Sequence, residues 1–182
     1  MPESPFPVRS VAVPAQSRLV NFFEHTCLVD AYEIRLPPGT STNPETLARF
    51  VMSQQAPWMA GLMRVRDAMV AGFGLKTSRM LTDPPDASAT RRIGIFRIFE
   101  THANEIVLGE DDKHLDFRLS LMRQSQGSAL GDEATLTLST TVHCHNAFGR
   151  GYISLIAPFH RRIVQAMLRS AARAGWPQRA SI

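Results

Sequence analysis

The sequence is poor in cysteine and has no long hydrophobic segment. Its two cysteines, Cys27 and Cys144, form no C-x-x-C motif, which argues against a disulfide-rich secreted scaffold and favours free thiols in the cytoplasm. No apolar run approaches the ~20 residues that a membrane-spanning helix needs. The opening stretch has three prolines before position 10 and no apolar segment like that of a signal peptide. We therefore expect a cytoplasmic protein without a membrane span, with a disordered arm over residues 1–16.

Motifs of several common enzyme classes are also missing. The chain has no G-x-G-x-x-G fingerprint and no G-x-S-x-G elbow, so we expect neither a dinucleotide cofactor nor a nucleophilic serine. The net charge is +4, but the basic residues near the C-terminus are scattered, without interleaved aromatic residues or a Lys/Arg block. A solvated helix face explains them better than a nucleic-acid surface. We expect no cofactor and no nucleic-acid partner.

The chain does contain a series of periodic segments within 182 residues, a length that suits one domain. We place this domain at 17–176, followed by a short tail at 177–182. A β-branched and aromatic run predicts a strand at 26–36. Thr42 or Asn43 can cap the next helix, which has Pro44 in its first turn. A second helix, starting at Pro57, carries an apolar stripe up to Gly74.

Four further strands are predicted at 93–100, 105–108, 115–123 and 134–145. Short connections link the first three, whereas 124–133 is expected to be a longer loop. A long helix follows and ends near Gly175. An antiparallel sheet with one buried face needs this helix as its cover. The predicted fold is α+β of the helix-grip type: a curved antiparallel sheet wrapped on a long C-terminal helix, with two helices after the first strand.

Three segments resemble an uncharacterised bacterial domain-of-unknown-function family (DUF2867-like): GEDDKHLDFR, PWMAGLMRVRDAMVAGFGLK and HNAFGRGYISLIAPFHRRIV, at 109–118, 57–76 and 145–164. That family is similar to the START-like (SRPBCC) superfamily, which includes polyketide cyclases, lipid-transfer domains and pollen allergens. The resemblance implies a helix-grip fold and a cavity for a hydrophobic ligand. Because related domains occur fused behind reductase-like domains, it also implies a possible reductase-type protein partner.

The positions of apolar residues predict how two of the strands pair. They are odd in 115–121 and even in 136–144, so both sets face the core when odd positions oppose even ones. One such register places Leu115 opposite Cys144. It also gathers a polar cluster on the other face of the sheet: His114, Asp116, His143 and His145. Such residues can bind zinc, but a polar outer face explains them without a metal, and we expect none.

His160 differs because it lies in the apolar stripe of the last helix. A histidine that faces the space between helix and sheet can act as a general acid or base. It can equally be a core histidine bonded to a backbone carbonyl or to Tyr152. Arg150 can hold an anionic group or bond the end of the helix. His160, Tyr152 and Arg150 are therefore the candidates for catalysis, and we expect His145 and His160 to have separate roles.

Three functions are compatible with these patterns. The first is binding of a small hydrophobic or amphipathic molecule in an apolar cavity. The second is a cyclase, dehydratase or isomerase that uses His160 in that cavity, and the third is an interaction module with a reductase partner. Whether the protein is an enzyme, and in which oligomeric state, is left open by the sequence. The expected ligand-binding residues are Trp58, Leu62, Met69, Phe117, Tyr152, Ile156, His160 and Met167.

Overall fold

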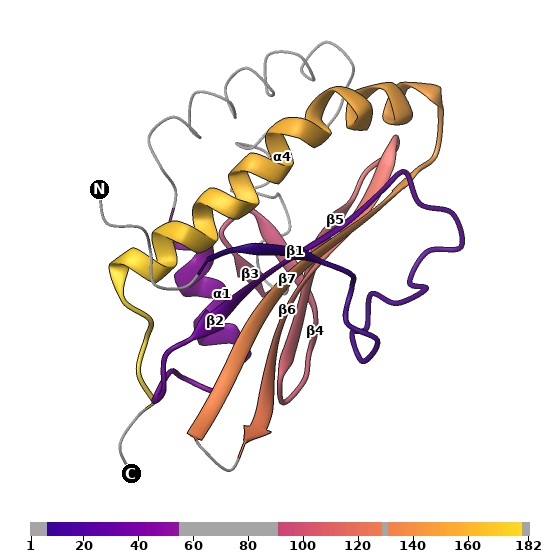
Figure 1. Cartoon of the computed structure of the whole chain (residues 1–182). Helices are drawn as coiled ribbons and strands as arrows, with labels where there is room; N and C mark the ends of the chain where they lie inside the picture. Colours follow the sequence, from indigo (N-terminus) through magenta and orange to yellow (C-terminus); the bar gives the residue numbers. More distant parts are fainter. Residues whose placement is uncertain (1–6, 55–90, 129–130, 180–182) are drawn as a thin grey trace.

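A computed structural model of the chain describes residues 7–54, 91–128 and 131–179. It is an α+β fold in which a helix crosses one face of a curved, seven-stranded antiparallel sheet (Figure 1). The strand order is β1-β2-β7-β6-β5-β4-β3. The elements are β1 (Arg9–Val11), β2 (Leu28–Leu36), α1 (Pro44–Ser53), β3 (Arg92–Ile93), β4 (Phe96–Thr101), β5 (Glu105–Asp111), β6 (Leu115–Ser128), β7 (Gly131–Cys144) and α4 (Ala147–Ala174).

Helix α1 follows β2, as the sequence predicts, and its cap is now identified. The Asn43 side chain accepts hydrogen bonds from the backbone N–H groups of Glu45 and Thr46, at 2.9 and 3.1 Å. Asn43 rather than Thr42 is therefore the N-cap, which satisfies two otherwise unpaired donors. The second predicted helix, starting at Pro57, lies outside the described residues, as do Trp58, Leu62 and Met69.

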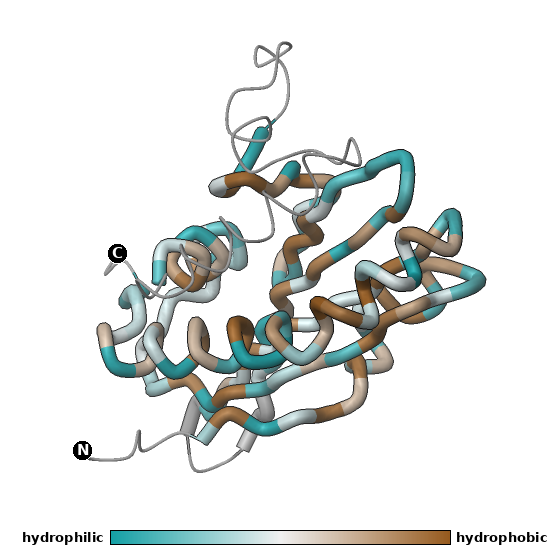
Figure 2. Tube along the Cα trace, turned by 90° about the horizontal axis from the view of Figure 1, so that it is seen from above, coloured by the Kyte–Doolittle hydropathy of each residue, from teal (hydrophilic) through white to brown (hydrophobic). Residues whose placement is uncertain are grey.

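The predicted register between the two long strands is confirmed. Leu115 lies opposite Cys144, and Asp116 lies opposite His143. Hydrophobic and hydrophilic residues alternate along much of the sheet (Figure 2). The alternate apolar positions of both strands, among them Leu119, Leu121 and Leu138, are buried in the core. Burial of one face therefore fixed the register, because a slip by one residue would turn every one of these side chains outward.

Several strand predictions are wrong in their boundaries; the strand expected at 105–108, for example, is β5 and continues to Asp111. The strand expected at 93–100 is divided into β3 and β4 by a two-residue turn, in which Gly94 has a positive φ of 58°. Such a turn favours glycine because other residues are strained there. The loop expected at 124–133 is mostly strand, since the pairing of β6 with β7 continues to Ser128 opposite Gly131. Backbone hydrogen bonds extend this hairpin despite its polar, glycine-containing sequence.

Both ends of the predicted domain also extend further than expected. Residues 9–11, assigned to the disordered arm, form the edge strand β1 and pair with β2. At the other end, residues of the predicted tail pair with the turn after β2. The N–H of Ser41 donates to the carbonyl of Pro177, and that of Arg179 donates to the carbonyl of Gly39. These contacts are between segments far apart in sequence, so local patterns do not reveal them.

The segment between β1 and β2 packs on the sheet face opposite α4. Ser17 and the N–H of Arg18 donate hydrogen bonds to the buried carboxylate of Glu105, and Ser120 contacts the same carboxylate. The guanidinium of Arg118 lies over the ring of Phe99, with 3.7 Å between Cζ and the ring centroid. This second face therefore has its own polar contacts, distinct from the apolar face under α4.

Helix α4 begins at Ala147 and continues through Pro158. The Asn146 side chain caps it by accepting a hydrogen bond from the N–H of Gly149 at 2.9 Å. Gly149 is required here because a Cβ atom would collide with the carbonyl oxygen of His114. Within the described ranges, no helix is long and apolar enough to cross a membrane.

Candidate functional site

The space between α4 and the sheet contains two separate apolar clusters. The larger cluster includes Tyr32, Leu138 and Val164, together with residues of α1, β5 and β6. The smaller cluster surrounds the start of β2, the end of β7 and the first turns of α4, and its buried members are Leu28, Leu115, Val142, Cys144 and Ile153. The hydrophobic core is therefore interrupted along the helix.

A polar layer, defined as Asp30, Thr140 and His160, lies at this interruption. On β2, Asp30 falls between Leu28 and Tyr32, which belong to different clusters. Thr140 is the partner of Asp30 in the β2–β7 register. On α4, His160 lies between residues of the smaller and the larger cluster. Each residue faces the interior because it shares the strand parity or helix face of its apolar neighbours.

Asp30 is the least expected member of this layer. Its side chain is only 8% exposed, and neither carboxylate oxygen has a hydrogen-bond partner among the described residues. Two basic side chains of the described residues lie close to it: His160, with 3.5 Å between Nε2 and Oδ1, and Arg161, with 3.8 Å between Nε and Oδ2. A buried carboxylate without hydrogen bonds is costly. Asp30 is therefore poorly explained by stability alone.

His160 faces the sheet, where the helical periodicity places it. Its Nε2 atom is buried and lacks a hydrogen-bond partner within the described part of the chain. The 3.5 Å to Asp30 is an ion-pair distance that falls outside good hydrogen-bond geometry. Sequence reasoning considered a backbone carbonyl or Tyr152 as the partner of this histidine. The structure places it beside Asp30 instead.

The charge of Asp30 affects the pKa of the neighbouring Tyr32 hydroxyl. Burial raises the pKa of Tyr32 above its ordinary value, and the negative charge of Asp30 raises it further. A hydrogen bond with Gln165 and the positive charge of Arg161 oppose these effects. Gln165 of α4 is therefore close to the sheet. The Thr140 hydroxyl is also buried and has no partner among the residues described.

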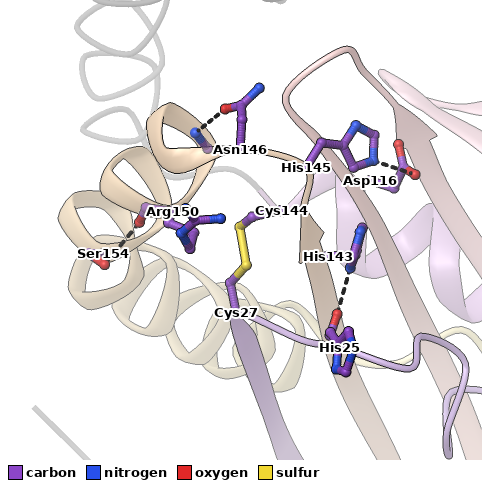
Figure 3. Close-up of a disulfide and its surroundings, with 10 residues drawn as sticks. His25, Cys27, Asp116, His143, Cys144, His145, Asn146, Arg150 and Ser154 are labelled. Atoms are coloured by element: carbon purple, nitrogen blue, oxygen red, sulfur yellow. Dashed lines mark hydrogen bonds and ion pairs between the residues drawn. A yellow bond between two sulfur atoms is a disulfide. The ribbon is translucent and has the colours of Figure 1, made fainter.

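The other predicted residues are distributed between the clusters. Phe117 and Tyr152 pack against the smaller cluster, Met167 belongs to the larger one, and Ile156 is half-buried on α4. Arg150 is exposed, and its backbone carbonyl accepts a hydrogen bond from the Ser154 hydroxyl (Figure 3). The cavity expected between both helices involves residues outside the described ranges, so it stays a prediction.

The sequence contains a signal for Asp30, although this residue was not among the predicted site residues. The strand LVDAYEIRL has apolar residues at its even positions from Leu28 to Leu36, except at Asp30. An acid on the buried face of a strand departs from the pattern in a way that needs a compensating partner. That partner, His160, is distant in sequence, and only the folded arrangement brings the two together.

The predicted polar cluster on the opposite face is formed in part. His145 Nε2 is 2.9 Å from Asp116 Oδ2, and His143 Nδ1 is 2.6 Å from the carbonyl oxygen of His25 (Figure 3). The rings of His143 and His145 are 5.3 Å apart. His114 makes different contacts, since its Nδ1 accepts a hydrogen bond from Asn146 at 2.9 Å. Among the described residues, no three His, Cys, Asp or Glu side chains are arranged to hold a metal ion.

The Asp116 carboxylate gives His145 a distinct electrostatic environment. A hydrogen bond to Asp116 is the main effect that raises the pKa of His145 above its ordinary value. Partial burial opposes this, while the carbonyl of Lys113 and the charge of Asp111 support it. His145 is therefore stabilised in its protonated form at the end of the sheet. It lies on the face opposite His160, as expected for separate roles.

The expectation of free thiols is wrong. Cys27 and Cys144 form a disulfide across 117 residues of sequence, with their Cα atoms 6.1 Å apart (Figure 3). They meet because β2 and β7 are neighbours, and the N–H of Cys27 donates to the carbonyl of Val142 at 2.8 Å. The expectation of a cytoplasmic protein rested on free thiols and loses that support.

Comparison with known proteins identifies a family but no activity. A family model described as "Protein of unknown function (DUF2867)" matches residues 22–167, which include β2, the polar layer and most of α4. No curated protein and no solved structure matches the chain. The functional argument therefore depends on the geometry of this chain.

Proposed function

The chain belongs to the DUF2867 family of proteins of unknown function, and we propose that it binds a small amphipathic molecule between α4 and the sheet. The observation that carries this proposal is the buried Asp30 carboxylate beside Nε2 of His160, since neither group has a hydrogen-bond partner in the part of the chain that the structure describes. Binding sites for small molecules are largely apolar and contain a few convergent polar groups. The two apolar clusters with the polar layer between them have this composition.

The START-like (SRPBCC) class is part of the same proposal. A curved antiparallel sheet crossed by a long C-terminal helix supports it. The similarity between the START-like superfamily and the DUF2867-like family, which three sequence segments resemble, supports it as well. In such an arrangement the ligand would contact the helix-facing residues of both clusters. The reductase-type partner stays a prediction.

A thermal-shift screen tests whether a ligand binds. The purified protein is mixed with alcohols, amines, carboxylic acids and polyketide-like aromatic compounds of increasing apolar size. We expect members of this panel to raise the melting temperature, because a ligand that binds only the folded state stabilises it by mass action. If no compound changes the melting temperature, the proposal is wrong.

Two variants, each with an alanine of α4 replaced by phenylalanine, test where the ligand binds. Ala157 lies on the inner side of α4, packed against the smaller cluster, so Ala157→Phe narrows the space next to His160. Ala174 is exposed at the end of the helix, so Ala174→Phe is the matched control. We expect Ala157→Phe to remove the thermal response while circular dichroism shows that the fold remains. A response retained in Ala157→Phe would place the ligand elsewhere.

Acid–base catalysis is a second candidate function, favoured by the proximity of Asp30 to His160. A carboxylate beside one ring nitrogen of a histidine, here Nε2, can orient the ring and stabilise the imidazolium that forms when the other nitrogen, Nδ1, removes a proton. This chemistry suits an isomerase, cyclase or dehydratase. Small molecules extracted from the purified protein can be returned to it in D₂O. Deuterium uptake that His160→Gln abolishes would support catalysis, and no uptake by the wild-type protein would leave binding alone.

A further inference from the structure

We infer that the polar end of the ligand is a neutral hydroxyl group, rather than a carboxylate or an amine. This inference rests on the proposed function and specifies the ligand class. Three side chains of the polar layer have buried polar atoms with no hydrogen-bond partner among the described residues: both oxygens of Asp30, Nε2 of His160 and Oγ1 of Thr140. Their combined requirement for donors and acceptors selects the ligand.

Asp30 needs a donor. Its two carboxylate oxygens are acceptors, and only 8% of the Asp30 side chain is exposed. A ligand carboxylate would bring a second negative charge next to this largely buried one, where like charges repel strongly. The ligand must therefore offer an O–H or N–H group to Asp30.

His160 needs an acceptor. We assign the proton of its ring to Nε2, because a lone pair facing the Asp30 carboxylate at 3.5 Å would be repelled. Arg161 adds a positive charge, with its Nε 3.8 Å from Oδ2 of Asp30. An ammonium group only donates hydrogen bonds, so it would leave His160 unsatisfied and would be repelled by Arg161.

A hydroxyl group meets both requirements, because it donates one hydrogen bond and accepts others. Two atoms that are 3.5 Å apart can both lie at ~2.8 Å from one bridging oxygen, which is an ordinary hydrogen-bond distance. The hydroxyl would donate to Asp30 and accept from His160, with Thr140 opposite Asp30 as an additional partner. Its hydrocarbon part would contact the adjacent apolar clusters. The ligand class is therefore an aliphatic or alicyclic alcohol.

Four probes with the same eight-carbon chain test the inference by calorimetric titration: 1-octanol, its methyl ether, octylamine and octanoate. The ether accepts hydrogen bonds but cannot donate them, so it isolates the contact with Asp30. We expect 1-octanol to bind about tenfold more tightly than each of the other three, the usual size of one hydrogen bond to a charged group.

Two variants assign the contact to a residue. Asp30→Asn should reduce the affinity for 1-octanol about tenfold and improve that for octanoate, because the negative charge is gone. Glu33→Gln removes a charge from the same strand on its other face, so it should leave all four affinities unchanged. Asp30→Asn is expected to fold, because it replaces an unsatisfied buried charge by a neutral group of the same shape.

The outcomes separate this inference from the proposed function. Equal binding of all four probes, lost in Ala157→Phe, would support a ligand site and refute the hydroxyl assignment. Tighter binding of octanoate or octylamine, or an octanol affinity that Asp30→Asn does not change, would refute it as well. Binding of none of the probes would refute both.

Discussion

The protein contains two Asp–His pairs in opposite situations. The inner pair, Asp30 and His160, lies between α4 and the sheet, with buried polar atoms that make no hydrogen bond among the described residues. The outer pair, Asp116 and His145, lies at the end of the sheet, is about a quarter to a third exposed, and is joined by a 2.9 Å hydrogen bond. Among the described residues, the same two residue types therefore have hydrogen-bond partners in one place and none in the other.

This difference separates a structural role from a binding role. Hydrogen bonding and solvent contact are sufficient to explain the outer pair, which needs no ligand. The inner pair costs stability as it stands, because a buried carboxylate loses its hydration without gaining donors. A buried acid that costs stability is a candidate for a functional site, because binding a ligand would supply the missing donors.

The disulfide beside the outer pair should give the largest effect on stability. Replacing Cys27 and Cys144 by alanine should lower the free energy of unfolding by about 2–5 kcal/mol, because the unfolded chain loses its cross-link. This change loosens the strand end near the outer pair and leaves the inner pair in place. Urea unfolding followed by circular dichroism measures it. A reducing agent should destabilise the wild-type protein and leave the double variant unaffected; equal stability of the wild type with and without the agent would contradict the prediction.

Neutralising the two carboxylates should have opposite effects. Asp30→Asn should raise the free energy of unfolding by about 1–3 kcal/mol, because it removes a desolvated charge. Asp116→Asn should lower it, because His145 loses its hydrogen-bonded partner. Urea unfolding of both variants near pH 6 tests the comparison directly. If Asp30→Asn is less stable than the wild type, the inner carboxylate is structural and the distinction between the pairs fails.

The smallest effect concerns the pH dependence of the outer pair. The pKa of His145 in the folded protein is raised, mainly by Asp116. Its contribution to stability should therefore be complete below the pKa of the unfolded chain, near ~6.5, and disappear as the pH rises through the higher folded value. The amount should be under ~1 kcal/mol, as for exposed ion pairs.

Nuclear magnetic resonance titration of the histidine ring protons measures this pKa directly. Asp116→Asn should bring the pKa of His145 back towards its ordinary value, whereas Asp30→Asn should leave it unchanged because Asp30 lies on the other face of the sheet. An unshifted His145 in the wild-type protein would show that the 2.9 Å contact is not maintained in solution.

Much of the fold could be predicted from local patterns. Alternating leucines predicted the pairing of β6 with β7, including Leu115 opposite Cys144. The TNPE segment at 42–45 predicted the start of α1. The apolar stripe of the last helix predicted that His160 faces the sheet. Only one of the three residues of the polar layer, His160, was predicted; Asp30 and Thr140 were not. No local pattern links His160 to Asp30, because Asp30 is on the second strand of the sheet and His160 on the last helix.

The sequence by itself determined which side chains face inward, because burial of one face of a strand or helix imposes a period that local order records. Tertiary structure alone decided which of these residues meet. The order of strands in the sheet placed β2 beside β7, which brought Cys27 to Cys144 and Asp30 to Thr140. The crossing of α4 over these strands then placed His160 against Asp30. Such contacts join segments that are more than 100 residues apart, so they form only when the strands pair and α4 packs on the sheet.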